Sequence, residues 1–484
     1  MKYILILLTA LSIGACSNNL DELNENIKVP ETVPGEALFT SAQKNLVDQM
    51  TSTSVNSNIF RLVAQHWTET VYTDETNYEL NGRNIPQNYW RALYRDVLKN
   101  LDQATIEFNK ITPSSPAEEI EKNNKIQITE VLKIYTYAVL VDTFGNVPYS
   151  EALNIENKSP KYDDALTIYK DLLLRLDGAI NNLNKEGTSF DVNDNIYQGD
   201  SEKWFKFANS LKLRLALTLS YVPSEAGLAK TYATEALPNI FQSNADSALF
   251  TYLGATPNTN QLFAGLVASG RNDFIPANTL VDFLNKTDDP RRKYFFDENI
   301  KSPQGDIIYK GGVYGALNSF PSFTYFDEQF LDPTAKATIF DYTEVQFLLA
   351  EASAKGLIGS PSDAENYYNE AITSSILYWG GTETEVQAYL SNPLVAYATS
   401  GATWQEKIGN QAWIGLYNRG FEAWNTWKRV DFPKLVAPED ARSEIPVRFT
   451  YPINEQTLNA SSYKSASNAI GGDTVETKLF WDQN

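Results

Sequence analysis

The stretch VLKIYTYAVLVDTFGNVPYSEAL, residues 131–153, decides the fold class of this chain. From Ile126 into this stretch, apolar side chains recur every three or four positions, which is the spacing of one face of an α-helix. The helical pattern ends at residues 144–148, FGNVP, whose glycine and proline are typical of a turn. A second pattern of the same period runs from about Asp163 to Leu183. Together they predict a helical hairpin.

Two further helical hairpins are expected downstream. Ser201 can cap a helix whose partner is capped by Ser224, and a third pair begins near Val345. In the third pair, Ser360 is placed to cap the second helix, with Pro361 at the first helical position. The helix–turn–helix units look like tetratricopeptide repeats, but long segments separate them.

The segment 241–341 differs from the helical pairs in its composition. It is rich in Gly, Pro, Asn and aromatic residues, and residues 309–326, YKGGVYGALNSFPSFTYF, are its extreme case. We therefore predict an all-α protein in which a rigid helical scaffold carries a loop-rich insertion that binds a ligand. The expected parts of a single body, 35–484, are a scaffold over 36–240 and 342–380, the insertion over 241–341, and a Trp-rich helical segment over 400–484 that is helical at 404–429.

The charge balance excludes one class of partner. The 484 residues include 60 acidic and 40 basic side chains, for a formal net charge of −20. A chain this acidic repels phosphate backbones, so we expect no nucleic-acid binding. Electrostatic docking on an anionic membrane is disfavoured for the same reason.

The N-terminal sequence suggests another way in which the chain attaches to a membrane. The apolar run 4–13 is much shorter than the ~20 residues that span a bilayer, and it ends in small residues before Cys16. We interpret residues 1–15 as a lipoprotein signal peptide, Cys16 as the lipidation site, and 16–34 as a flexible leader. The alternative is a signal peptide that is cleaved elsewhere. Cys16 is the only cysteine, so the mature fold has no disulfide.

Several segments in chain order carry a family resemblance. Beyond 131–153, these are ACSNNLDELNEN (15–26), TDDPRRKYFF (287–296), YTEVQFLLAEASAKG (342–356), WIGLYNRGFEAWNTWKRVDFP (413–433), EIPVRFTYPINEQTLN (444–459) and GGDTVETKLFWD (471–482). With them the chain resembles the SusD/RagB family of outer-membrane nutrient-binding lipoproteins. The resemblance implies a helical fold with tetratricopeptide-type hairpins and display on the cell surface. It also implies a SusC-like TonB-dependent transporter as partner and a glycan, or less commonly a peptide, as ligand.

Little in the sequence supports catalysis. His66 is the only histidine, and the only cysteine is assigned to a lipid, so histidine metal clusters, Ser-His-Asp triads and thiol nucleophiles are excluded. We expect no catalytic residues, no metal and no cofactor. A glycoside hydrolase remains an alternative because it needs only two carboxylates, but nothing in the sequence suggests the barrels or sandwiches typical of that chemistry.

Four aromatic side chains between two expected helices are candidate ligand contacts: Trp67, Tyr72, Tyr78 and Trp90. An aromatic ring can bury the apolar face of a sugar, while polar side chains hold its hydroxyls. The alternative for Trp67 and Trp90 is that they are core residues at helix ends.

The insertion supplies the second group of candidates. Arg271 and Asp273 lie in a Gly-flanked loop, and Tyr314, Phe323 and Tyr325 follow in the aromatic stretch. The alternative for Arg271 and Asp273 is a local salt bridge that holds the loop.

Other conspicuous residues are assigned to structure. Asp289 and Arg291 flank Pro290 at a turn before a helix, and Trp413, Trp424 and Trp427 lie at helical spacing, as core residues do. The expected function is therefore capture of an oligosaccharide or polysaccharide at the cell surface and its delivery to a transporter. Peptide capture by the same architecture, a protein-docking scaffold and a glycoside hydrolase are the alternatives.

Overall fold

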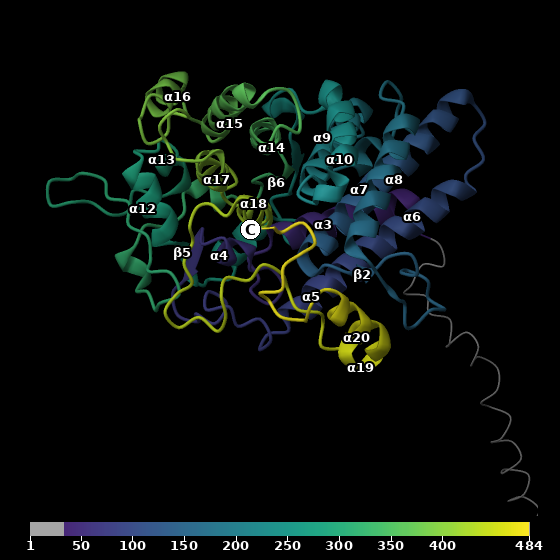
Figure 1. The fold of residues 1–484 in the computed structure, drawn as a ribbon, viewed down its shortest axis with the longest axis horizontal. Helices are drawn as coiled ribbons and strands as arrows, with labels where there is room; N and C mark the ends of the chain where they lie inside the picture. Colours follow the sequence, from purple (N-terminus) through teal and green to yellow (C-terminus); the bar gives the residue numbers. More distant parts are fainter. Residues whose placement is uncertain (1–32, 484) are drawn as a thin grey trace, which may run out of the picture.

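The computed structural model describes residues 33–483 and confirms the predicted all-α architecture (Figure 1). The predicted signal peptide 1–15 and the lipidation site Cys16 lie outside the described residues, as does nearly all of the leader 16–34. Within residues 33–483, no helix is both long and apolar enough to cross a membrane. Strands are short and occur as three two-stranded sheets in this part of the chain.

The first helices form one side of the scaffold. Helix α3 (Gly35–Thr51) packs against α6 (Lys99–Lys110), which continues α5 (Ile85–Arg91) through a π-helical segment, Ala92–Leu98. On α3, the ring of Phe39 stacks on Phe190 at 3.7 Å between centroids. This contact closes the inner face of α3 against the loop that precedes α9.

The predicted hairpins are present, and α7 begins ten residues earlier than Ile126, where the sequence pattern begins. Helix α7 (Pro116–Phe144) pairs with α8 (Ala165–Asn182), and α9 (Ser201–Leu219) pairs with α10 (Ala226–Ala236). Figure 1 shows these four helices gathered in one half of the molecule. Strands β2 (Val147–Pro148) and β3 (Tyr162–Asp163) pair between α7 and α8. The turn at 144–148 is thus closed by a short sheet.

The helix caps only partly follow the prediction. Helix α9 is capped by Asp200, whose side chain accepts from the Lys203 N–H, so Ser201 is the first helical residue and not the cap. Ser224 lies inside a short 3-10 turn before α10 and caps nothing. Ser360 is the predicted cap, and it forms a reciprocal capping box with Asp363. An aspartate side chain accepts a hydrogen bond from a helix N–H as well as a serine does, which explains why the cap of α9 is one residue earlier than predicted.

The later helices complete the scaffold and the other half of the molecule. The segment 404–429 is helical as predicted, but it forms two helices, because the chain breaks at residues 416–419 and Asn418 takes a left-handed conformation. A side-chain carbon at Gly420 would lie 2.3 Å from the Arg61 backbone nitrogen, so only glycine allows this close approach. The helices are α14 (Tyr342–Ala354), α15 (Ala364–Tyr378), α16 (Glu383–Leu390), α17 (Trp404–Gly415), α18 (Gly420–Val430), α19 (Glu455–Leu458) and α20 (Ala460–Ala469).

The insertion contains short regular elements joined by long loops. Strand β4 (Ala248–Phe250) pairs with β6 (Ala337–Phe340), so the two ends of the insertion meet. Its other elements are α11 (Gln261–Phe263), a π-helical turn (Ala264–Ala268), β5 (Phe274–Pro276), α12 (Asn278–Lys286) and α13 (Arg292–Phe295). Strand β5 pairs antiparallel with β1 (Trp67–Glu69), placing Glu69 opposite Phe274.

The core connects both halves around the short helix α4 (Phe60–Val63). The ring of Phe60 contacts Phe421 at 5.2 Å, Trp424 at 5.0 Å and Phe449 at 4.9 Å. Trp413 and Trp424 are buried as predicted, whereas Trp427 is half-buried. Residues about 360 positions apart in sequence therefore share one core.

Candidate functional site

The β1–β5 pairing brings two distant loops side by side. Beyond the strands, the Thr70 N–H donates to the Asp273 carbonyl at 2.9 Å, and the Thr70 hydroxyl donates to the Asn272 carbonyl at 2.7 Å. The loop after β1 therefore lies against the loop before β5. This arrangement places Tyr72 next to Arg271 and Asp273, which the sequence suggested as separate candidates.

These three residues line an open pocket of about 590 Å³, which we call the Tyr72 pocket. Its volume is within the ~300–1,000 Å³ that is usual for small-ligand sites. The lining comes from the loop after α3, the β1 and β5 loops, and the α11 turn. The lining residues are Ser52, Thr53, Ser54, Val55, Asn56, Glu69, Tyr72, Arg83, Gln261, Ala264, Gly265, Ser269, Arg271, Asp273 and Phe274.

Tyr72 presents an aromatic face to solvent. Its side chain is 57% exposed, and the Arg271 guanidinium carbon lies 5.7 Å from the ring centroid. Arg271 also forms a bidentate pair with Asp273, so the local salt bridge considered from the sequence is present, and it lies in the pocket. The Asp273 carboxylate raises the pKa of Arg271. The pair is charge-neutral and partly exposed, with 54% of the Arg271 side chain and 32% of the Asp273 side chain accessible to solvent.

The opposite wall depends on a close contact between two segments. A side-chain carbon at Gly265 would lie 1.8 Å from the Thr53 hydroxyl oxygen, so glycine lets the α11 turn approach the loop at 52–56. On this wall, the side-chain amides of Asn56 and Gln261 make no hydrogen bond within residues 33–483. Both amides are therefore free to donate to or accept from a bound ligand.

One buried carboxyl group, that of Glu69, lines the pocket, and the buried carboxyl group of Glu75 lies beside it. Glu69 and Glu75 are 3% and 0% exposed, and Glu75 forms an ion pair with Arg83. Glu69 accepts from the N–H and the hydroxyl of Thr76, at 3.0 and 2.9 Å. Burial, followed by the nearby charge of Glu75, raises the pKa of Glu69 well above its usual range. The raised pKa favours the protonated, uncharged form of Glu69.

Four of the predicted ligand contacts are corrected by their burial. Trp67 is 1% exposed, because its ring packs on Phe326 at 4.4 Å between centroids and lies beneath the Arg61 guanidinium. Tyr78 and Tyr314 are 3% and 8% exposed, and their hydroxyls meet at 3.4 Å. These three residues have no ring face to offer a ligand in solution. They hold the loops that carry the pocket.

Trp90 is corrected for the same reason. It is 7% exposed on α5 and packs edge-to-face on Phe144 at the end of α7, at 5.0 Å between centroids. Trp67 and Trp90 are therefore both core residues, which was the alternative interpretation of their positions in the sequence.

Two further candidates are partly exposed but do not line the Tyr72 pocket. Tyr325 is half-buried and stacks on Phe320 at 4.4 Å between ring centroids, with an interplanar angle of 15°. Phe323 is half-buried under Lys310, whose ammonium lies 4.8 Å from the ring centroid. The aromatic stretch at 309–326 and the Tyr72 loop thus do not form one shared surface of rings.

Sequence reasoning missed several lining residues. Arg83 lies in the same polar loop as Tyr72, and its position between two helices is the signal that could have indicated it. Glu69 lies in a strand too short to recognise from periodicity. The loop at 52–56 is far from both candidate groups and has no local pattern that indicates a site.

Comparison with known proteins identifies the family. Residues 25–452 match the SusD-like family, described as starch-binding and associating with the outer membrane, and the chain belongs to that family. The family resemblance and the fold class that the sequence predicted are both confirmed. The family role is glycan binding at the outer membrane, together with a SusC-like transporter.

Solved structures show the same fold. A chitin-binding protein is 26% identical, with a TM-score of 0.78 over 93% of this chain and 99% of its own. A SusD homologue from Bacteroides uniformis is 24% identical, with a TM-score of 0.76 over 92% of this chain and 99% of its own. A chitin-binding SusD homologue from Flavobacterium johnsoniae is 23% identical, with a TM-score of 0.73 over 93% of this chain and 98% of its own. No curated protein matches the chain.

Proposed function

We propose that the Tyr72 pocket is the glycan-binding site of this chain, and that it takes a neutral polysaccharide segment. The observation that carries the proposal is the exposed Tyr72 ring beside the Arg271–Asp273 pair in an open 590 Å³ pocket. The ring covers the apolar face of a sugar, and the paired side chains bind hydroxyls without a net charge. An open pocket of this kind accepts the middle of a chain as well as its end.

A β-linked N-acetylglucosamine polymer is the first ligand to test. A chitin-binding structure shares 26% identity across nearly the whole chain. The free amides of Asn56 and Gln261 suit an acetamido group, because each can donate to its carbonyl and accept from its N–H. The family description makes starch the second ligand to test.

Gel retardation in polysaccharide, followed by calorimetry, tests the site. Tyr72→Ala should weaken binding by about tenfold or more, because losing one stacked ring costs about 1.4 kcal/mol or more. Val71→Ala is the matched control, since Val71 is 58% exposed on the same loop but does not line the pocket. Equal retention of wild type and Tyr72→Ala contradicts the site. Binding to a peptide digest with no retention by any polysaccharide favours peptide capture.

The buried carboxyl pair supports binding without hydrolysis. A glycosidase needs two carboxyl groups ~5–10 Å apart on either side of the scissile bond. Glu75 is fully buried and paired with Arg83, and Glu69 is held by Thr76. Neither group has the accessibility that this chemistry requires. Release of reducing sugar during the binding experiment would oppose this part of the proposal.

We further propose that a lipid on Cys16 holds the protein at the outer face of the membrane, where it covers a SusC-like TonB-dependent transporter as a lid. The small residues before Cys16 and the family membership support this placement. Mass spectrometry of the mature N-terminal peptide should find a diacylglyceryl group on Cys16. Co-purification from solubilised membranes should recover a TonB-dependent barrel. An unmodified Cys16 contradicts the anchor, and recovery without a barrel contradicts the partner.

A further inference from the structure

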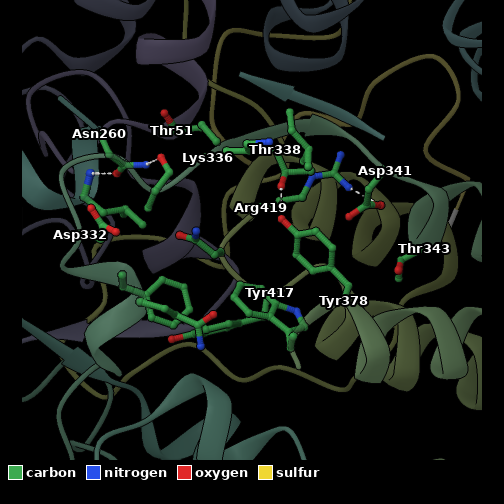
Figure 2. A pocket seen from close by; sticks show the side chains of 18 of the residues that line it. Thr51, Asn260, Asp332, Lys336, Thr338, Asp341, Thr343, Tyr378, Tyr417 and Arg419 are labelled. Atoms are coloured by element: carbon green, nitrogen blue, oxygen red, sulfur yellow. Dashed lines mark hydrogen bonds and ion pairs between the residues drawn. The ribbon is translucent and has the colours of Figure 1, made fainter. Parts of the chain in front are cut away.

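A second cavity of about 390 Å³ lies next to the Tyr72 pocket and shares no lining residue with it. It is enclosed by β6, the end of α15, and the turn between α17 and α18, and we call it the Trp379 pocket (Figure 2). The wall between the two pockets is the start of α11. Asn260 anchors this wall by donating from its amide to the Ala335 carbonyl at 2.7 Å.

One side of the Trp379 pocket is aromatic. Trp379 is half-buried, with its ring centroid 5.3 Å from Phe330 and 6.3 Å from Tyr417. Tyr378 completes this side, and Figure 2 shows it reaching toward Thr338 and Arg419, with its hydroxyl 3.0 Å from the Thr338 hydroxyl. The rings offer flat apolar surface, and the hydroxyl pair lies at its edge.

The other side is polar and charge-balanced. Arg419 is paired with Asp341 at 2.9 Å, and the mouth has one exposed charge of each sign, Lys336 and Asp332. The Arg419 Nε–H is buried and has no hydrogen-bond partner within residues 33–483. The Gln329 side-chain carbonyl likewise accepts no bond in this part of the chain. The Gln329 carbonyl and the Tyr378–Thr338 hydroxyl pair are therefore left to bind a neutral ligand that carries hydroxyl groups.

We propose that the Trp379 pocket is a second saccharide site, which takes a short neutral saccharide of one or two sugar units. Its volume is near the lower end of the ~300–1,000 Å³ range for small-ligand sites, which suits a short saccharide better than a polymer segment. The balanced charges give an anionic sugar no advantage over a neutral one. This inference rests on the proposed glycan function for its ligand class, but the residues that carry it are different.

Calorimetry with N,N′-diacetylchitobiose and with maltose tests the second site. At least one of these disaccharides should bind the wild-type chain, and Trp379→Ala should weaken that binding by tenfold or more. Tyr72→Ala should reduce retention by polysaccharide and leave the disaccharide affinity within about twofold of wild type. Because Trp379 contributes to packing, Lys336→Ala serves as a second variant. Its exposed side chain can be removed with little effect on the fold, and the disaccharide affinity should fall about threefold.

The two proposals fail in different ways. The second site is refuted if polysaccharide is retained but neither disaccharide binds. It is also refuted if Tyr72→Ala abolishes disaccharide binding while Trp379→Ala leaves it unchanged. In both cases the Tyr72 site stands. If disaccharide binding depends on Trp379 while no polysaccharide is retained, the Tyr72 proposal fails and the second site stands. Thermal denaturation of each variant shows whether a loss of binding is a loss of folding.

Discussion

At the scale of single residues, the buried carboxyl groups of Glu69 and Glu75 make the stability of the folded protein depend on pH. Burial raises the pKa of both groups, and the charge of Glu75 raises that of Glu69 further. The folded protein therefore keeps a proton on Glu69 at pH values where the unfolded chain, with an ordinary pKa of about 4.3, has lost it. The folded state binds more protons, so this group's contribution to stability falls as pH rises.

Glu69→Gln should remove that dependence. Between about pH 5 and the raised pKa of Glu69, the wild-type free energy of unfolding should fall relative to the variant, by up to about 1.4 kcal/mol per pH unit. Urea unfolding at pH 5, 7 and 9 measures the difference between the two proteins. Asp74→Asn is the control, because Asp74 is an exposed carboxyl on the same loop. Parallel pH profiles for wild type and Glu69→Gln would show that Glu69 does not titrate between folded and unfolded states.

At the scale of elements, the turn between α12 and α13 is attached to two other helices by one buried ion pair. Asp289 and Arg291 have no exposed side-chain surface, and the guanidinium also donates to Ser375 on α15 at 2.9 Å and to Gln411 on α17 at 3.1 Å. The structural assignment made from the sequence is confirmed. The pair holds the insertion against the scaffold.

Asp289→Asn should cost about 3–5 kcal/mol of stability, because it leaves Arg291 buried without its countercharge. The adjacent Asp288→Asn is a close control, since Asp288 is 85% exposed and pairs with Arg292 at the surface. Its effect should stay within about 0.5 kcal/mol. Chemical denaturation of the two variants gives both values. Similar losses for both would mean that burial of the Asp289 pair is not what stabilises the turn.

The helical elements could be predicted because their signal is local. The period of residues 131–153 and the cap at Ser360 depend on neighbours within a few positions, and both appear as expected. The pairing of β1 with β5 is different, since three residues near 67 meet three residues near 275. No local pattern indicates such a pairing.

This difference explains the outcome at the candidate site. Composition indicates a loop at Trp67, but the residue is buried, because Phe326 packs on it from a distant segment and Arg61 covers it from the neighbouring helix α4. Tyr72, Arg271 and Asp273 come together through the same pairing, which the sequence could not show. Residue type indicated which side chains suit a sugar, and only the tertiary contacts decide which of them reach solvent.

At the scale of the whole molecule, a buried charged network joins four helices. Arg419 pairs with Asp341 and Glu344 at α14, Arg214 on α9 pairs with Glu344 at 2.7 Å, and the Tyr135 hydroxyl on α7 donates to Glu422 on α18 at 3.2 Å. These groups lie within the apolar core that both halves share. The network ties Asp341, the last residue of the insertion, to Arg419 at the start of α18, and we expect the insertion to fold together with the scaffold.

Residues 33–483 should consequently unfold in a single transition. In urea, tryptophan fluorescence, which reports mainly on the core, and far-UV circular dichroism, which reports on the helices, should give the same midpoint. Arg419→Met should shift both curves to lower urea together. Two separated transitions would contradict the single body expected for 35–484 and would show that the insertion melts apart from the helical scaffold.

The contact between α4 and α18 also makes the segment before β1 depend on the C-terminal part of the chain. Phe60 is enclosed by Phe421, Trp424 and Phe449, and the Trp413 indole donates to the Ala64 carbonyl at 2.8 Å. A chain truncated before residue 413 lacks all four of these aromatic residues, so nothing in it encloses Phe60 or holds Ala64 just ahead of β1. We therefore expect a protease cut that removes this C-terminal part to disturb the distant pairing of β1 with β5 as well.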